Sequence, residues 1–208
     1  MTILNQHTEF HYNPFAGVSQ DDIHRILVPK FDMEALAAEI MQEQPLLVEF
    51  VGKKGRGKST HLSFLHQIIP QYPLFSLNRG ADFSSIIRHA SSVILIDSIH
   101  HLNFFQRRQL FNQKQVVIYT CHRSKAWEQC FIGKQKKRFR FRGLSLELLK
   151  EIVRLRIGLA VKEPESEINL NEAALKRLLS TYKDDYRAII NALFDQFQPP
   201  WMSKSASY

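Results

Sequence analysis

The sequence predicts an α/β fold, in which a parallel sheet with flanking helices is followed by a small all-α unit. Short apolar runs, typical of strands buried on both faces, occur at Leu46–Val51, Val93–Ile96 and Val116–Tyr119. Stretches with helical spacing lie between these runs, as expected when helices connect parallel strands. After Gly143 only helix-like patterns remain. The two parts should therefore meet near that residue.

The elements of the first part follow in order. A helix is predicted at 32–42, where apolar residues recur at helical spacing behind Asp32, a good N-cap residue. The first strand, 46–51, leads through a glycine-rich loop into a helix at 60–69. A short strand is expected at 74–77 and helices at 83–89 and 103–112, on either side of the strand at 93–96. Arginine and phenylalanine alternate from Arg138 to Arg142, which indicates a last strand with one covered face.

The second part should contain three amphipathic helices. The first, at 144–159, has apolar residues at helical spacing: Leu144, Leu148, Ile152, Leu155 and Leu159. The others are expected at 171–180 and 185–197, and Pro199-Pro200 ends the last one. The predicted domains are therefore an α/β domain at 1–142, a helical unit at 143–198 and a flexible tail at 199–208.

Composition limits the class of protein. The 208 residues carry a net charge of +8 with a pI near 9.6, which favours a polyanionic partner such as nucleic acid. No apolar stretch is long enough to span a membrane, and residues 1–11 lack the apolar core of a signal peptide. Two cysteines are too few for a disulfide framework. We expect a cytoplasmic protein without a membrane partner.

A phosphate-binding pattern, G-x-x-x-x-G-K-[ST], occupies residues 52–59 between a predicted strand and a predicted helix. Glycines let the loop aim N–H groups at phosphate oxygens, Lys58 can neutralise the β- and γ-phosphates, and the Ser59 hydroxyl can bind Mg²⁺. The alternative is a Gly/Lys-rich surface turn. The predicted nucleotide contacts of this P-loop NTPase domain are Gly52, Lys53, Lys54, Gly55, Arg56, Gly57, Lys58, Ser59 and Thr60, with ATP and Mg²⁺ as cofactors.

A second nucleotide pattern ends the apolar run 93–96 with Asp97, in the manner of a Walker B strand. An Asp at the carboxyl end of a parallel strand lies where ligands bind, and there it can hold Mg²⁺ together with Ser59. Buried strands also end in Asp by chance, but its position about 40 residues after the loop favours the metal-binding interpretation.

With these two motifs the chain resembles the AAA+ branch of P-loop ATPases over about residues 13–197. The resemblance implies a helical lid, a polar residue after the next strand that senses the γ-phosphate, and an Arg at the start of the third lid helix. Thr120 and Arg187 match these two positions, so the implied catalytic residues are Lys58, Asp97, Thr120 and Arg187. Asn13-Pro14-Phe15 also resembles the start of ATPases that accompany DNA transposition or replication loading. It can equally be a turn with Phe15 in the core.

The sequence departs from that family at Ser98, where AAA+ hydrolases place the Glu that polarises water. Glu49, on a neighbouring strand, and His100 are the possible substitutes, and Glu49 can equally face solvent or pair with a cation. ATP binding is therefore predicted, while hydrolysis is left open. A slow ATPase or a nucleotide-gated switch fits best.

A basic segment at 134–142 contains six cations: Lys134, Lys136, Lys137, Arg138, Arg140 and Arg142. It can be a solvated strand edge, a nucleic-acid phosphate track, or a source of cations for a neighbouring subunit in a nucleotide-dependent homo-oligomer. Arg123, Arg138 and Arg140 are the candidates for that last role. Phe104-Phe105 beside Arg107-Arg108 can stack on single-stranded bases, or be core residues next to exposed arginines.

Two other functions remain open on sequence alone. A small-molecule or nucleotide kinase uses the same loop, with Asp82 as a possible acceptor-binding residue, although kinase lids are normally inserted within the sheet. A non-enzymatic adaptor with a structural nucleotide, acting through a protein partner, is the other alternative.

Overall fold

The computed structural model describes residues 3–4, 9–17, 23–162, 168–183 and 185–198. The chain divides into two compact units. The sheet unit is Pro29–Arg142, and the helical unit combines Met1–Val28 with Gly143–Tyr208. Within the described residues, no helix is long and apolar enough to cross a membrane. The predicted tail, 199–208, lies outside the described residues.

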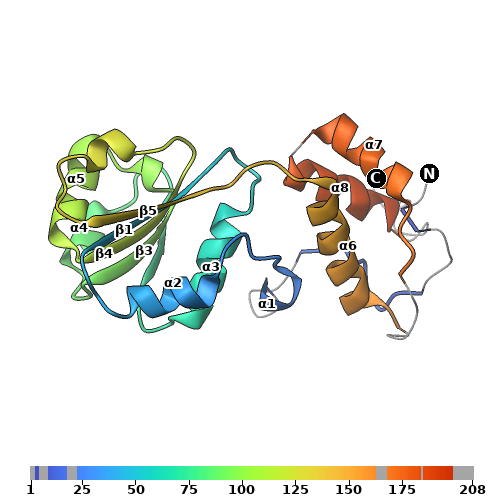
Figure 1. Ribbon diagram of the computed structural model, residues 1–208, viewed down its shortest axis with the longest axis horizontal. Helices are drawn as coiled ribbons and strands as arrows, with labels where there is room; N and C mark the ends of the chain where they lie inside the picture. Colours follow the sequence, from blue (N-terminus) through green and yellow to red (C-terminus); the bar gives the residue numbers. More distant parts are fainter. Residues whose placement is uncertain (1–2, 5–8, 18–22, 163–167, 184, 199–208) are drawn as a thin grey trace, which may run out of the picture. The chain divides into compact units, whose positions relative to one another are not determined.

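The sheet unit contains five strands in the order β2-β3-β4-β1-β5, and every neighbouring pair is parallel (Figure 1). This confirms the predicted parallel sheet. The strands are β1 Leu46–Val51, β2 Leu74–Ser76, β3 Val93–Asp97, β4 Val116–Cys121 and β5 Gln135–Arg140. β5 begins three residues earlier than predicted, because the lysines at 136 and 137 extend the ladder along β1.

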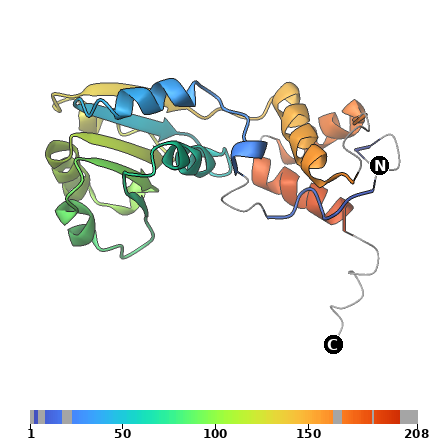
Figure 2. The same ribbon diagram turned by 90° about the horizontal axis from the view of Figure 1, so that it is seen from below.

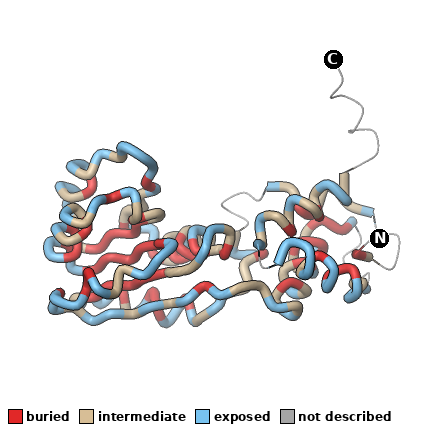
Figure 3. The backbone as a smooth tube through the Cα atoms, turned by 90° about the horizontal axis from the view of Figure 1, so that it is seen from above, coloured by how far each residue is buried: buried red, intermediate tan, exposed pale blue. Residues whose placement is uncertain are grey.

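Helices cover both faces of this sheet (Figures 1 and 2). On one face, α2 Met33–Ile40 and α3 Lys58–Ile68 pack against alternate strand residues such as Val48 and Leu95. On the other, α4 Phe83–Arg88, α5 Phe104–Gln113 and the short turn η1 Ile99–His101 pack against their neighbours, such as Leu47 and Ile94. The central strands β3, β4 and β1 form the buried centre between these layers (Figure 3). This alternation explains why β1, β3 and β4 are apolar at most positions on both faces.

The helical unit has its own core, built by the helices α6, α7 and α8 and the N-terminal segment. Its helices are α1 Ile23–Ile26, α6 Leu146–Ala160, α7 Glu172–Tyr182 and α8 Tyr186–Gln196. Ser145, Asn171 and Asp185 cap the last three, since each side chain accepts a hydrogen bond from a first-turn N–H. These three helices are therefore encoded locally as well as by their apolar faces.

Residues 1–28 belong to this helical unit, which differs from the predicted boundary of an α/β domain at 1–142. Leu4 bridges to Leu170 and Phe10 to Val161, and Phe15 is buried among the helices. Asn13 explains the local turn, because its amide donates to the carbonyl of Phe194 at 2.9 Å and its oxygen accepts from the Phe15 N–H at 3.0 Å. The Asn13-Pro14-Phe15 motif is thus a turn that anchors Phe15 in the core.

Candidate nucleotide-binding site

The loop between β1 and α3 has a backbone that glycine favours at two positions. Gly55 and Gly57 have φ angles of 79° and 81°, in the left-handed region. Gly57 is the N-cap of α3 and offers no side chain to its first-turn N–H groups. Those groups lie at the positive end of the helix dipole and lack a side-chain acceptor, which is the arrangement that binds phosphate oxygens.

Gly52 is needed for a different reason, a close approach to the chain that follows β5. A Cβ at this position would lie 2.5 Å from the carbonyl oxygen of Phe141, closer than atoms tolerate. The same stretch is held to β1 by the Phe141 N–H, which donates to the Val51 carbonyl at 2.8 Å. The first glycine of the loop therefore lets β1 and the end of β5 close together beneath it.

Lys58 is the first residue of α3, and its side chain is buried within the loop. Its Nζ donates to the carbonyl of Lys53 at 2.8 Å. Burial lowers the pKa of Lys58; Cys121 and Asp97 act in the opposite direction, and Arg56 lowers it further. Among the described residues no carboxylate forms a salt bridge with this ammonium group. A phosphate would supply the missing negative charge, so the loop fits a nucleotide.

Asp97 lies at the carboxyl end of β3 between two hydroxyl groups. The Ser59 hydroxyl donates to Asp97 Oδ1 at 2.9 Å, and the Thr120 hydroxyl donates to the same oxygen at 2.5 Å. Thr120 reaches it because β4 lies beside β3 in the sheet. Mg²⁺ in nucleotide sites is held by one or two oxygen ligands from the protein together with phosphates and water. Ser59 and Asp97 together fit that requirement.

Ser98 occupies the position where a hydrolytic Glu was sought. Its φ of 64° places it in the left-handed region, which costs roughly 1–3 kcal/mol for a residue with a side chain. Its N–H donates to the Thr120 hydroxyl at 2.8 Å, so Thr120 links the ends of β3 and β4. The Thr120 hydroxyl thereby donates to Asp97 and accepts from Ser98.

Glu49 is a buried structural carboxylate. It lies on β1 in register with Tyr119 of β4 and Arg138 of β5, and both side chains bond to it. It also accepts from the Ser124 hydroxyl at 2.7 Å and the Lys125 N–H at 2.5 Å. Burial alone would raise the pKa of Glu49, but these hydrogen bonds and the Arg138 charge hold it below its ordinary value. The substitution of Glu49 for the missing Walker B Glu is thus disfavoured.

Three histidine rings gather after Asp97, a feature that sequence reasoning missed. The His100 ring centroid lies 4.3 Å from that of His101 and 4.6 Å from that of His122. His100 and His101 are adjacent in the chain, and the tight η1 turn brings their two rings together. Nδ1 of His100 is buried without a hydrogen-bond partner in the described part of the chain. Burial lowers the pKa of His100, and the two neighbouring histidines lower it further.

The remaining predicted residues are placed as follows. Lys53 and Lys54 are exposed at the loop, Arg56 is largely buried, and Thr60 is half-buried in the first turn of α3. Arg187 is exposed in the first turn of α8, in the helical unit, where its N–H donates to Asp185 at 3.0 Å. Its contact with a nucleotide stays a prediction.

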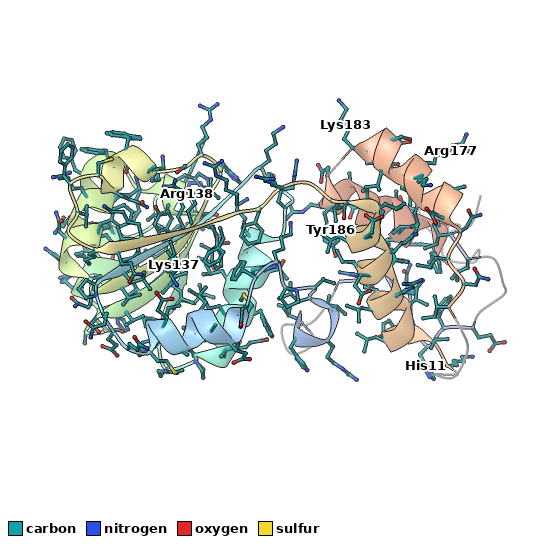
Figure 4. The ribbon with its side chains drawn as sticks, viewed as in Figure 1. His11, Lys137, Arg138, Arg177, Lys183 and Tyr186 are labelled. Atoms are coloured by element: carbon teal, nitrogen blue, oxygen red, sulfur yellow. The ribbon has the colours of Figure 1, made fainter. Side chains whose placement is uncertain are left out.

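Half of the basic segment is engaged within the sheet unit. Lys137 pairs with Glu39 of α2, Arg138 with Glu49, and Lys134 donates to the carbonyl of Lys114. Lys137 and Arg138 project to opposite sides of the edge strand β5 (Figure 4). The other three cations, at 136, 140 and 142, are exposed, and their side chains form no ion pair with any residue that the structure describes. Charged edge strands also resist unwanted pairing with other chains.

Comparison with known proteins identifies the fold. No family model matches the sequence, and a search of curated proteins finds no match. A DNA replication initiation factor aligns with a TM-score of 0.55 and 14% identity, over 82% of this chain and 62% of its own. The Thermotoga maritima RuvB Holliday junction branch migration motor aligns with a TM-score of 0.52 and 20% identity, over 85% and 61%.

A third structure, replication initiator DnaA bound to AMPPCP and single-stranded DNA, aligns with a TM-score of 0.53 and 14% identity, over 82% of this chain and 62% of its own. The chain thus spans about three fifths of the length of these structures. Identities this low show the fold alone, a parallel sheet with helices on both faces that is followed by C-terminal helices. The predicted fold class is confirmed.

Proposed function

We propose that this chain binds ATP with Mg²⁺ and uses the bound nucleotide to control an interaction with nucleic acid or with a protein bound to it. The observation that carries the proposal is the Ser59–Asp97 pair, 2.9 Å apart, beside a glycine loop and a buried lysine that forms no salt bridge with the residues the structure describes. In this proposal the first-turn N–H groups and Lys58 hold the phosphates, and Ser59 and Asp97 hold Mg²⁺. Arg187 would report the γ-phosphate to the helical unit.

The direct test is ATP affinity of the Lys58→Ala chain, measured by titration with a fluorescent ATP analogue. We expect a loss of at least about 100-fold, because a buried charge–phosphate contact is worth about 3 kcal/mol or more. Lys176→Ala, which removes an exposed lysine of α7, is the control and should bind as the parent does. Unchanged affinity in Lys58→Ala would refute the proposal.

Hydrolysis should be slow. Ser98 carries no carboxylate, and Glu49 is already saturated by its own partners. Acid–base assistance typically contributes about 10²–10⁴-fold to a rate, which is the factor expected to be missing. Multiple-turnover phosphate release, with and without DNA, measures it. Stimulation by DNA supports a slow ATPase, and binding without turnover supports a switch or an adaptor.

A nucleic-acid partner is supported by the net charge of +8 and by the three exposed cations of the basic segment. One matched structure, the replication initiator, contains single-stranded DNA. A nucleotide-dependent homo-oligomer, with Arg123 or Arg140 acting on a neighbour's nucleotide, belongs to the same proposal. Arg138 is less suited to that role because it pairs with Glu49. Mass in solution with and without ATP tests the oligomer, and a cytoplasmic location stays a prediction.

A further inference from the structure

Exposed aromatic side chains gather where α5 begins and meets the short turn η2, Ala126–Gln129. Phe105 and Trp127 are 78% and 63% exposed. The Phe104 ring joins them: its centroid lies 5.5 Å from that of Phe105 and 5.3 Å from that of Trp127, and it is parallel to the indole within 3°. We call these three residues the aromatic platform. A fourth exposed aromatic, Phe131, follows η2 by two residues and is 83% exposed.

A single exposed phenylalanine is ordinary on a protein surface, but a joined group in a rigid setting points to a partner. A buried ion pair fixes this platform. Arg107 of α5 binds Glu128 of η2 through two hydrogen bonds, of 2.7 and 2.8 Å. In the sequence Arg107 directly precedes Arg108, and Glu128 directly follows Trp127. The pair therefore locks the two elements that carry the rings.

The start of α5 is fixed as well. Asn103 accepts from the Gln106 N–H at 3.0 Å, and Gln106 accepts from the Asn103 N–H at 2.9 Å, which makes a capping box. Phe104 and Phe105 are the first two residues of the helix so capped. A surface that is ordered before binding loses little conformational entropy when a ligand stacks on it.

The charge around the platform indicates the chemistry of the partner. Between Asp97 and Glu147 the sequence contains eleven lysines and arginines but one acidic residue, Glu128, which is buried and paired with Arg107. Arg108 lies four residues after Phe104 and three residues after Phe105, and therefore on the same side of α5. Arg123 is exposed in the segment that leads from β4 to η2. Flat apolar rings within a basic surface match bases and phosphates together.

We propose that the aromatic platform binds single-stranded nucleic acid by stacking unpaired bases on Phe105 and Trp127, while nearby arginines hold the phosphates. A duplex cannot use this surface in the same way, because its bases are already stacked on one another. The proposal rests on the proposed function for a nucleic-acid partner. It adds a preference for single strands and names the contact residues.

The test uses the full chain with Trp201→Phe, which leaves Trp127 as the only tryptophan. A single-stranded oligonucleotide is titrated in, and the tryptophan emission is followed. Stacking should quench that emission strongly, whereas a duplex of the same sequence should leave most of it. In a filter-binding assay, Phe105→Ala and Trp127→Ala should each weaken single-strand affinity by about 5- to 100-fold, the range for loss of one stacked base.

Met41→Ala is the matched control, since Met41 is also an exposed large apolar residue of the sheet unit but lies at the end of α2. It should bind single strands as the parent does. Phe105 is so exposed that its removal should leave folding intact, and a thermal unfolding curve checks this. If Phe105→Ala and Trp127→Ala bind single strands as tightly as the parent, the platform is not the site, although the chain still binds nucleic acid.

Two further outcomes separate this inference from its rivals. If neither single strands nor duplex bind the parent chain, the nucleic-acid part of the proposed function fails together with the platform. If the platform variants instead lower the mass of the parent chain in solution and leave oligonucleotide affinity unchanged, the surface is an interface with a second copy. That result would overturn the proposal of base stacking. The proposal is supported if the platform variants lose affinity for single strands and for nothing else.

Discussion

Two carboxylates near the carboxyl end of the same sheet have opposite surroundings. Asp97, on β3, accepts hydrogen bonds from the hydroxyl groups of Ser59 and Thr120. Glu49, on β1, is almost fully buried and bonds to a guanidinium group, a backbone N–H and the hydroxyls of a serine and a tyrosine. Asp97 is thus held by neutral hydroxyl groups, whereas Glu49 forms an ion pair with a guanidinium group.

This difference indicates which of the two carboxylates is available to bind a metal ion. Hydroxyl groups can turn away from Asp97 and leave its oxygens to a metal ion at little cost, since neutral hydrogen bonds are worth only about 1 kcal/mol net. Glu49 would have to abandon Arg138 and a backbone N–H inside the protein. Breaking such a pair typically costs about 3–5 kcal/mol. Asp97 therefore suits ligand binding, and Glu49 holds β4, β1 and β5 together.

The largest expected effect is on stability when Glu49 is removed. Glu49→Ala should lower the free energy of unfolding by about 3 kcal/mol or more, because Arg138, Ser124 and the Lys125 N–H lose their acceptor. Urea denaturation followed by circular dichroism measures this. A loss below about 1 kcal/mol would mean that Glu49 is not a structural carboxylate, and the contrast with Asp97 would collapse.

A buried histidine beside the loop, His61, should make the stability of the fold depend on pH. His61 Nδ1 lies 2.8 Å from the Gly57 carbonyl, and its Nε2 accepts from the Lys30 N–H at 3.3 Å. The neutral ring with a proton on Nδ1 satisfies both contacts. Burial lowers the pKa of His61 to about 4, despite the Gly57 carbonyl, which acts in the opposite direction.

Because the folded pKa of His61 lies below the ordinary value of 6.5, the unfolded chain binds the proton first as the pH falls. Its contribution to stability is complete above pH 6.5 and is lost progressively toward pH 4. Between pH 8 and pH 5 the loss should be about 2 kcal/mol. His61→Gln, which cannot titrate, should remove that part of the pH dependence in urea denaturation. An identical pH profile in both chains would contradict it.

Sequence patterns predicted the sheet better than they predicted the helical unit. Continuous apolar runs identify β1, β3 and β4 because both faces of those strands are buried, so no choice of face is needed. In α6 a choice is needed. The sequence offers the apolar set at 144, 148, 152, 155 and 159, but the fully buried positions include Leu149, Val153 and Ile157. Apolar residues on both sides leave the orientation to packing partners.

The site was predictable where it depends on local spacing and not where it depends on contacts across the sheet. The loop and Asp97 follow from motifs, and the structure places Ser59 and Asp97 in hydrogen-bond contact. The partners of Glu49 come from β4, β5 and the segment before η2, which no local pattern relates. The same holds for Arg107, which forms a buried pair with Glu128 of a distant segment.

A smaller effect on stability is expected at the other carboxylate. Asp97→Asn should change the free energy of unfolding by less than about 1 kcal/mol, because an amide oxygen can still accept from Ser59 and Thr120. ATP at 100 times its Kd should stabilise the parent by about 2.7 kcal/mol, and the share that depends on Mg²⁺ should disappear in the variant. Thermal unfolding with ATP, with and without Mg²⁺, measures this. Equal Mg²⁺ dependence in both chains would place the metal elsewhere.

The smallest effect separates two arginines on the same face of β5. Arg138 pairs with Glu49, whereas Arg140, two residues on, is exposed without an ion pair among the described residues. Arg140→Gln should leave stability within about 0.5 kcal/mol, as expected for a surface change. If Arg140 contacts a phosphate, the variant should reduce the steepness of log affinity against log salt by roughly 0.7 to 0.9.

Arg138→Gln should instead destabilise the fold, because Glu49 stays behind in the interior without its counter-ion. Titrations at several salt concentrations and urea denaturation distinguish them, and a lost salt dependence in Arg138→Gln alone would reverse the assignment.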